Sequence, residues 1–188
     1  MNEHPVLMGA RVLLRLPCAE DVPGIIKFYA DNSKHFEVFA SPRPASFYTS
    51  EYWQGRVTAA AKDYEEDRAV NFFILSQQNQ TVLGFVNFFG IIRGAFHACY
   101  LGYGLSEAAV GQGIMTEALR LAVDYMFQTR NMHRIMANHS PHNIRSASVL
   151  RRLGFVPEGY ARDYLLIHGK WQDHVLNALT SSHWRSSE

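Results

Sequence analysis

The sequence lacks several features that would point to a membrane, a secretory route or a metal site. It contains two cysteines, Cys18 and Cys99, which are too few for a disulfide framework and lack metal-site spacing. No apolar run approaches the roughly 18 residues of a membrane span. The N-terminus has no basic segment followed by an apolar run, so no signal peptide is predicted. We therefore expect a cytoplasmic protein in a reducing compartment, with no membrane partner.

An excess of charge of one sign is also missing. Lys and Arg number 18 and Asp and Glu 17, which leaves a formal net charge of +1. This balance argues against a protein whose main task is to bind nucleic acid, and we expect no specific DNA partner. There is no internal repeat or low-complexity segment. With 188 residues, 47% of them hydrophobic, the chain suits a single globular domain over residues 1–188 with a sizeable core.

The most informative stretch is residues 96–130, which has the pattern of a strand, a glycine turn and a helix. Side chains alternate along a strand, so Gly102 and Gly104 fall on one face. Two glycines on one face predict that something approaches the backbone closely there. From Ile114 onward, apolar residues recur at helical spacing.

The turn Gly111-Gln112-Gly113 opens this helix. A helix N-terminus has unpaired N–H groups and a partial positive charge, and glycines leave those donors unobstructed. Together these features predict a cradle for a phosphate or pyrophosphate. The alternative is that the glycines merely form a tight turn, and the short motif alone favours that interpretation.

The remaining pattern predicts an α+β (α/β mixed) protein, in which strands and helices are interspersed along the chain. Strands are expected at 10–16, 70–76, 81–92, 134–138, 160–167 and 171–179, and helices at about 20–30, 50–67 and 143–153. A helix joining the strand of residues 96–106 to that of 134–138 implies one parallel pair. Residues 31–47 are expected to be a loop whose aromatic residues either line a substrate cleft or pack on the core. Residues 181–188 are expected to be a loose tail.

The glycine turn also belongs to a wider pattern. The run Gly-x-Gly-x-Met-Thr-Glu-Ala-Leu at 111–119, followed by Asn143-Ile144-Arg145-Ser146 and Leu153-Gly154-Phe155, resembles the GNAT acetyltransferases. The family motif has Arg or Gln three residues before the first glycine, where this chain has Ala108; the backbone cradle does not depend on that side chain. The resemblance implies a GNAT fold: a central mixed, mostly antiparallel sheet with one splayed parallel strand pair, flanked by helices. It also implies acetyl-CoA as co-substrate.

The C-terminal half carries a closer resemblance. Residues 133–138, 141–143, 158–161, 163–167 and 171–176 are similar to the RimJ type of ribosomal-protein alanine N-acetyltransferases. This resemblance implies acetyl transfer to the N-terminal α-amino group of a small-subunit ribosomal protein that begins with alanine. The ribosome or an assembly intermediate is then an expected wider partner.

The resemblance also implies roles for individual residues. Backbone groups near Leu105 and Ser106 would hold the pantetheine arm, and Asn143 would contact it. Ser146 would be the acid for the departing thiolate, directly or through water. The pyrophosphate would lie on the N–H groups of Gly111, Gln112, Gly113, Ile114, Met115 and Thr116. Read from the sequence alone, Asn143 is equally an N-cap and Ser146 a solvated helix residue.

The general base is the open role. An α-amino group has a pKa of about 8, so at neutral pH most of it is protonated and the enzyme needs a route for that proton. Some relatives carry a Glu on the strand before the glycine turn, where this chain has His97 or Tyr100; Glu107 is a third candidate. Histidines titrate in the right range. The alternative is that these side chains are structural.

Two other functions remain open at this point. One is a GNAT enzyme that acetylates a small amine or other protein N-termini, and the other is a non-catalytic binding module for ribosome assembly. The stretch from Met126 to Pro157 has no Asp or Glu but several Arg residues. These could bind the 3′-phosphate of coenzyme A, contact ribosomal RNA, or face solvent. His139 and His142 have no partner at metal-ligand spacing, so no metal site is expected.

Overall fold

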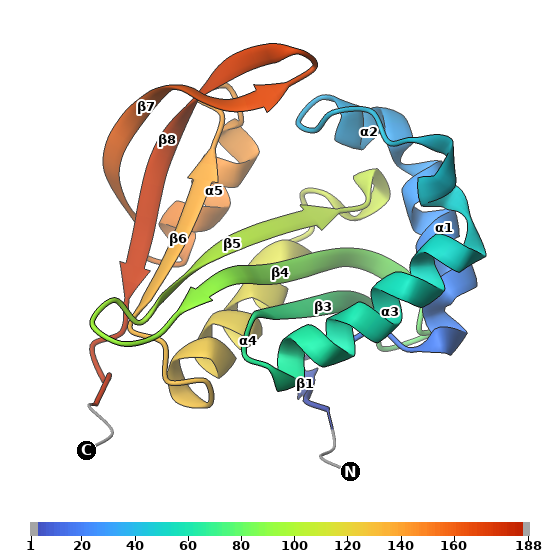
Figure 1. Cartoon of the computed structure of the whole chain (residues 1–188), viewed down its shortest axis with the longest axis horizontal. Coiled ribbons are helices and arrows are strands. Elements are labelled where there is room, and N and C mark those ends of the chain that lie inside the picture. The colour runs from blue at the N-terminus through green and yellow to red at the C-terminus, as the bar shows by residue number, and fades with distance from the viewer. Residues whose placement is uncertain (1–3, 186–188) are drawn as a thin grey trace.

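The computed structural model describes residues 4–185 as one eight-stranded sheet with helices on both faces (Figure 1). The strands are β1 Val6–Met8, β2 Val12–Arg15, β3 Ala69–Ser76, β4 Val82–Ile92, β5 Ala98–Leu105, β6 Arg134–His139, β7 Val156–Ile167 and β8 Lys170–Thr180. The α-helices are α1 Val22–Asp31, α2 Ser33–Glu37, α3 Ser50–Glu65, α4 Ile114–Gln128 and α5 Ile144–Arg152. None of these helices is long and apolar enough to cross a membrane.

The sheet order β1-β2-β3-β4-β5-β6-β8-β7 places a single parallel pair at its centre. Strands β5 and β6 pair only where residues 98–100 meet residues 134–136. Beyond that point the two strands diverge, as Figure 1 shows, while β6 keeps its pairing with β8 as far as His139. Residues 101–105 of β5 therefore have a strand partner on one edge only. This confirms the predicted α+β class with a splayed parallel pair.

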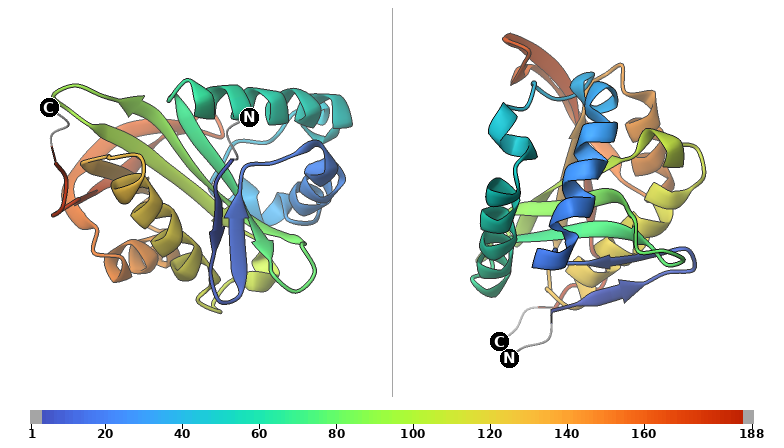
Figure 2. Two further views of the ribbon diagram at one scale, coloured as in Figure 1. Left: turned by 90° about the horizontal axis from the view of Figure 1, so that it is seen from below. Right: turned by 90° about the vertical axis from the view of Figure 1, so that its right-hand side faces the viewer.

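Two hydrophobic cores lie on the two faces of the sheet. Figure 2 shows the sheet and the helices that cover it from two further sides. Helices α4 and α5 cover one face, where Leu119 and Leu150 are fully buried. Helices α1 and α3 cover the other with an aromatic cluster. A Cβ on Gly104 would lie 2.6 Å from the Phe85 ring. The predicted close approach to this strand is thus made by an aromatic side chain of the protein itself.

The short elements are where the predicted pattern and the structure differ. Strand β1 precedes the predicted first strand and pairs antiparallel with β2. The predicted loop 31–47 contains α2, a five-residue helix without a side-chain cap. The strand predicted at 160–167 begins earlier in the structure, because β7 runs continuously from Val156 to Ile167 with irregular pairing to β8. Elements as short as β1 and α2 depend on tertiary contacts rather than on local propensity, so a sequence pattern does not reveal them.

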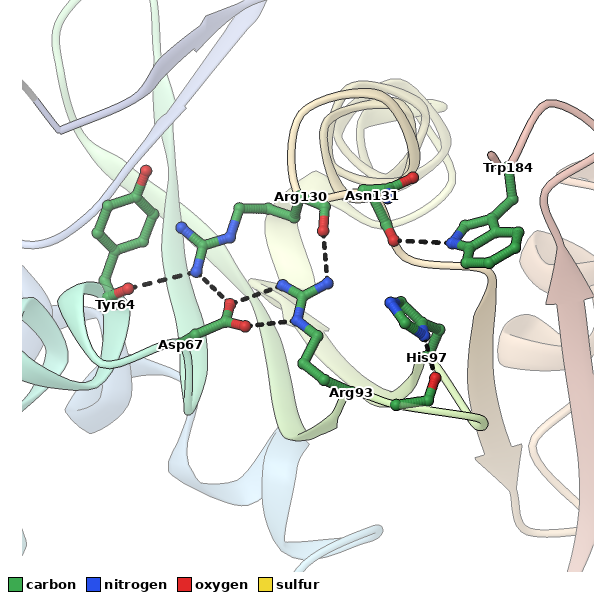
Figure 3. Close-up of polar contacts among 8 residues, drawn as sticks. Tyr64, Asp67, Arg93, His97, Arg130, Asn131 and Trp184 are labelled. Carbon is green, nitrogen blue, oxygen red and sulfur yellow. Dashed lines mark hydrogen bonds and ion pairs between the residues drawn. The ribbon is translucent and has the colours of Figure 1, made fainter. Parts of the chain in front are cut away.

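The C-terminal tail is not loose where the structure describes it. The indole Nε1 of Trp184 donates a hydrogen bond to the Asn131 carbonyl at 3.2 Å (Figure 3). Its ring meets His97 edge-on, with centroids 5.1 Å apart. Residues 186–188 of the predicted tail lie outside the described residues.

A cluster of charged residues links the connections that follow α3, β4 and α4, at the end of the molecule where Trp184 lies (Figure 3). Asp67, in the turn after α3, accepts a hydrogen bond from Nη2 of Arg93 at 2.8 Å and another from Arg130. Arg93 also donates to the backbone carbonyl of Arg130 at 2.7 Å. Burial alone would raise the pKa of Asp67, but the two guanidinium groups outweigh it and hold that pKa below its usual value.

We expect Asp67→Asn to lower the free energy of unfolding at pH 7 by about 1–2 kcal/mol, because both arginines lose a charged acceptor. The depressed pKa means that the Asp67 contribution is complete above the unfolded-state pKa of about 4 and disappears as the pH falls through the folded-state pKa. The stability difference between wild type and variant should therefore shrink on acidification. Urea unfolding at a series of pH values measures it. Asp124→Asn, which removes an exposed carboxylate from α4, is the control; an Asp67 deficit that stays constant down to pH 2 contradicts the assignment.

Candidate active site

The divergence of β5 and β6 opens a cleft of about 740 Å³ whose lining comes from both faces of the sheet. Its centre is the free edge of β5. On one side, called here the α4 half, it is lined by residues from 109–116 and from 143–152. On the other side, called here the hairpin half, the lining comes from residues 35–43 and from the β7–β8 hairpin between 165 and 174. A ligand in the cleft can therefore be approached from two opposite sides.

The glycine turn forms the floor of the α4 half. Gly111 and Gly113 have φ angles of 82° and 77°, a left-handed conformation that a side chain would strain. Gly113 is the N-cap of α4, and no side chain caps the helix there. The first three N–H groups of a helix have no intrahelical acceptor. Both glycines and these first three helical residues line the cleft, which is the arrangement that the predicted anion cradle requires.

Arg11 holds this turn in place. Its Nη1 donates to the Gln112 carbonyl at 2.8 Å, while its backbone N and its Nε both donate to the Glu117 carboxylate at 2.8 Å. Burial alone would raise the pKa of Glu117, but the bonds from Arg11 hold it below its usual value. The Glu117 carboxylate in the first turn of α4 is thus ionised, and the positive charge of Arg11 balances it. It therefore does not compete with a phosphate for the helix N-terminus.

The structure brings most of the predicted cofactor residues together, though not all. Those that line the cleft are Leu105, Gly111, Gly113, Ile114, Met115, Thr116 and Asn143. Ser106 does not, because its N–H donates to the Leu83 carbonyl at 2.8 Å and its own carbonyl accepts from Ala109. Gln112 turns its side chain back onto the Ala108 carbonyl, also at 2.8 Å. Both use their polar groups within the protein, which leaves the free edge of β5 as the surface for a pantetheine arm.

Asn143 and Ser146 meet at the start of α5. The Asn143 Oδ1 accepts from the Ser146 backbone N–H at 3.0 Å, so Asn143 is an N-cap and still lines the cleft with its amide. The Ser146 Oγ lies 2.6 Å from the Tyr103 Oη, which comes from β5. Burial raises the pKa of Tyr103 to about 12, so its phenol stays protonated. Two hydroxyls that share one hydrogen bond leave one O–H free to donate to a third group.

The predicted bases lie elsewhere. His97 is in the turn before β5, at the opposite end of that strand from Leu105 and against Trp184 (Figure 3). The Tyr100 ring stacks on Phe89 with centroids 5.7 Å apart. Neither of them lines the cleft, and neither does Glu107. The structure therefore does not place His97 or Tyr100 in the cleft beside Ser146, and the expectation that one of them takes the amine proton gains no support from this geometry.

Two buried histidines that were not among the predicted catalytic residues do line the cleft, His139 on β6 and His174 on β8. The register pairs His139 with Val175 and Asn138 with Leu176. Cross-strand partners share a face, so His174 lies on the same face as Asn138, opposite to that of His139. His139 thus belongs to the α4 half and His174 to the hairpin half. The sequence holds no local signal for this difference, because it depends on the β6–β8 register.

His174 is only 5% exposed, and its contacts fix its hydrogen-bonding roles. Its Nδ1 is 3.1 Å from the Gln172 carbonyl. A carbonyl oxygen only accepts, so Nδ1 donates there and Nε2 carries the lone pair of the neutral ring. The ring packs on Tyr164, with centroids 5.5 Å apart, and the Tyr164 hydroxyl accepts from Asn138 at 3.0 Å. The cleft therefore has an imidazole in its hairpin half and a pair of hydroxyls in its α4 half.

The cleft combines a strand splay, a helix N-terminus preceded by two glycines, and a pair of hydrogen-bonded hydroxyls, and comparison with known proteins identifies the family. The family described as "Acetyltransferase (GNAT) domain" matches residues 11–156. The chain belongs to this GNAT family and is an acetyltransferase. It is 41% identical over 174 residues to the [ribosomal protein uS5]-alanine N-acetyltransferase of Escherichia coli K12, covering 93% of this chain and 90% of that protein.

Solved structures show the same fold. The ribosomal-protein-S5-alanine acetyltransferase of Vibrio fischeri superposes with a TM-score of 0.93 at 33% identity, over 97% of this chain and 100% of that one. Mycobacterium smegmatis RimJ, solved in complex with CoA-disulfide, gives a TM-score of 0.86 at 26% identity, over 98% of this chain and 88% of that one. These similarities confirm the predicted GNAT fold and the resemblance to RimJ-type enzymes.

Proposed function

We propose that this enzyme transfers the acetyl group of acetyl-CoA to the N-terminal α-amino group of a small-subunit ribosomal protein that begins with alanine. The observation that carries this proposal is the similarity to the E. coli uS5-alanine N-acetyltransferase over 93% of the chain. The structural relative solved with CoA supports the donor. The cleft lining supports the chemistry, because it includes both a buried histidine, His174, and the hydrogen-bonded hydroxyls of Tyr103 and Ser146.

The α4 half has the donor groups that coenzyme A needs. The N–H groups at the start of α4 suit the pyrophosphate, and the free edge of β5 suits the amide-rich pantetheine arm. Arg145 and Arg152 of α5 also line this half, which favours phosphate binding over a purely solvated role for these two cations. Two other arginines of the basic stretch are used internally, Arg130 with Asp67 and Arg134 with Glu158.

The hairpin half would receive the amine. In this mechanism His174 takes a proton from the α-ammonium group at Nε2, and the freed amine attacks the thioester carbonyl. A C–N bond forms, the C–S bond breaks, the electron pair leaves with the sulfur, and the attacking nitrogen loses its second proton to water to become the amide nitrogen. The Ser146 hydroxyl donates a hydrogen bond to the departing thiolate, which is a weak base and is protonated from water. Tyr103 acts as a positioning residue, because its phenol shares a hydrogen bond with Ser146 Oγ.

The alternatives fit the cleft less well. A small amine needs only a narrow pocket, whereas this cleft continues through the hairpin half to residues of the segment 35–43. A non-catalytic module has no use for a cleft lined by both a buried histidine and a pair of hydrogen-bonded hydroxyls. Docking on the ribosome or an assembly intermediate, and a cytoplasmic location, stay predictions.

Acetylation of an alanine-starting ribosomal-protein peptide tests the proposed function. Incorporation of one acetyl group at a free α-amine, dependent on acetyl-CoA, supports it. No transfer to any α-amine, by protein that binds acetyl-CoA, contradicts it.

A further inference from the structure

We infer that the hairpin half contains a subsite for a carboxylate side chain of the acceptor, so that the enzyme favours N-termini followed closely by Asp or Glu over those followed by Lys or Arg. The subsite centres on Arg43. This inference rests on the proposed function, because it presupposes a peptide acceptor whose α-amine lies at His174.

The charge of the cleft lining is the first observation. Seven lining residues are basic, and no Asp or Glu is among the lining residues; the basic ones are His35, Arg43, His139, Arg145, Arg152, His168 and His174. Arg145 and Arg152 come from α5 and belong to the α4 half, where phosphates are expected. The hairpin half keeps a permanent positive charge at Arg43 without a lining counter-charge.

Arg43 is the second observation, because its guanidinium is held but not neutralised. Its Cζ lies 4.6 Å from the centroid of the Phe47 ring and 5.8 Å from that of Tyr29. Such contacts orient the guanidinium plane while its N–H groups stay available. Within residues 4–185 no carboxylate lies within ion-pair distance of Arg43, whereas Arg11, Arg15 and several other arginines have such partners. A carboxylate from a ligand would complete this arrangement.

Two histidines border the same space. The His35 ring packs on Phe36, with centroids 5.4 Å apart, and Phe36 packs in turn on Tyr29 beneath Arg43. His168, at the tip of the β7–β8 hairpin, bonds through Nε2 to the Glu37 backbone carbonyl at 2.5 Å.

The backbone N–H of His168 also donates to the Ser41 Oγ at 3.3 Å. These contacts bring the hairpin tip to the segment after α2, toward which it turns in Figure 1. Glu37 contributes its carbonyl there, and its side chain is not part of the cleft lining. A peptide that leaves the catalytic centre on this side therefore passes Arg43, His35 and His168.

The experiment uses peptides that begin with alanine and differ at one position. Asp, Asn or Lys is placed in turn at position 2, 3 or 4 of one neutral sequence, and kcat/KM is measured for each at low ionic strength. At one or more positions we expect kcat/KM for the Asp peptide to exceed that for the Lys peptide about tenfold, with the Asn peptide between them. The effect is no larger because a partly exposed ion pair with Arg43 contributes a modest free energy that salt screens. Arg43→Gln should reduce this ratio to within about twofold and leave the KM for acetyl-CoA unchanged.

Matched variants separate this role from general charge and from folding. Arg56→Gln removes an exposed arginine of α3 that does not line the cleft, and it should keep the preference. Arg43→Lys should keep part of it. Equal use of Asp and Lys peptides at all three positions, an Arg43→Gln enzyme with the wild-type preference, or a raised KM for acetyl-CoA in that variant overturns the inference. Failure of the proposed function looks different, since then no peptide of the series is acetylated.

Discussion

Replacing His174 by glutamine is expected to lower kcat by about 100-fold, with the KM for acetyl-CoA within about twofold of wild type. Glutamine is close in size and can still hydrogen-bond to the Gln172 carbonyl, so the local packing survives. It has no basic nitrogen, so the amine proton loses its acceptor. Steady-state kinetics with an alanine-starting peptide at saturating acetyl-CoA measures the loss.

The pH profile separates a base from a structural histidine. The wild-type kcat/KM should fall toward acid pH as the base becomes protonated, and His174→Gln should lose the part of that dependence which comes from the enzyme. His139→Gln is the matched control, because His139 is equally buried and lines the other half of the cleft. If His139→Gln slows turnover as much as His174→Gln does, or if the His174 variant keeps the full acid limb, the assignment fails.

Replacing Ser146 by alanine is expected to slow turnover about 100-fold and to leave the affinity for acetyl-CoA nearly unchanged. The departing thiolate loses its hydrogen-bond donor, whereas the N-terminus of α4 and Asn143 still hold the cofactor. Tyr103→Phe should cost about tenfold, because it removes only the partner that orients the serine hydroxyl. Single-turnover rates and direct acetyl-CoA binding distinguish these effects.

The two hydroxyls should not act independently. Residues in one hydrogen-bond network give non-additive effects, so the double variant should be little slower than Ser146→Ala alone. Ser50→Ala, which changes an exposed serine of α3 that does not line the cleft, is the control and should stay within about twofold of wild type. A more than tenfold loss of acetyl-CoA affinity in Ser146→Ala would assign the serine to binding rather than to the thiolate.

The parts of the site that the sequence predicted are local in the chain. Gly111 and Gly113 predict a turn that opens a helix, and the structure has this turn with both glycines at positive φ. The spacing of Asn143 and Ser146 predicts a capped first turn, and the hydrogen bond between them is present. Such features need only a few consecutive residues, so their chemistry can be read before the fold is known.

The parts that were missed depend on how distant segments meet. The sequence places His97 on the strand before the glycine turn, but the splay opens at the other end of that strand. His174 reaches the cleft only through the β6–β8 register. The Tyr103–Ser146 pair forms across the splay between β5 and α5, and no spacing rule connects them. Ser106 is the opposite case. It directly follows the cleft-lining Leu105 in the sequence, yet its backbone N–H and carbonyl form hydrogen bonds within the protein.

The most direct measurement of acceptor chemistry is intact-mass analysis of two peptides after incubation with acetyl-CoA and the protein. Both begin with alanine and continue with the sequence of a small-subunit ribosomal protein. One has a free α-amine, and the other is blocked there but keeps its lysines. The structure and its relatives predict a single acetyl group on the free peptide and none on the blocked one. Acetylation of the blocked peptide, or of neither peptide by protein shown to bind acetyl-CoA, would contradict transfer to an N-terminal α-amine.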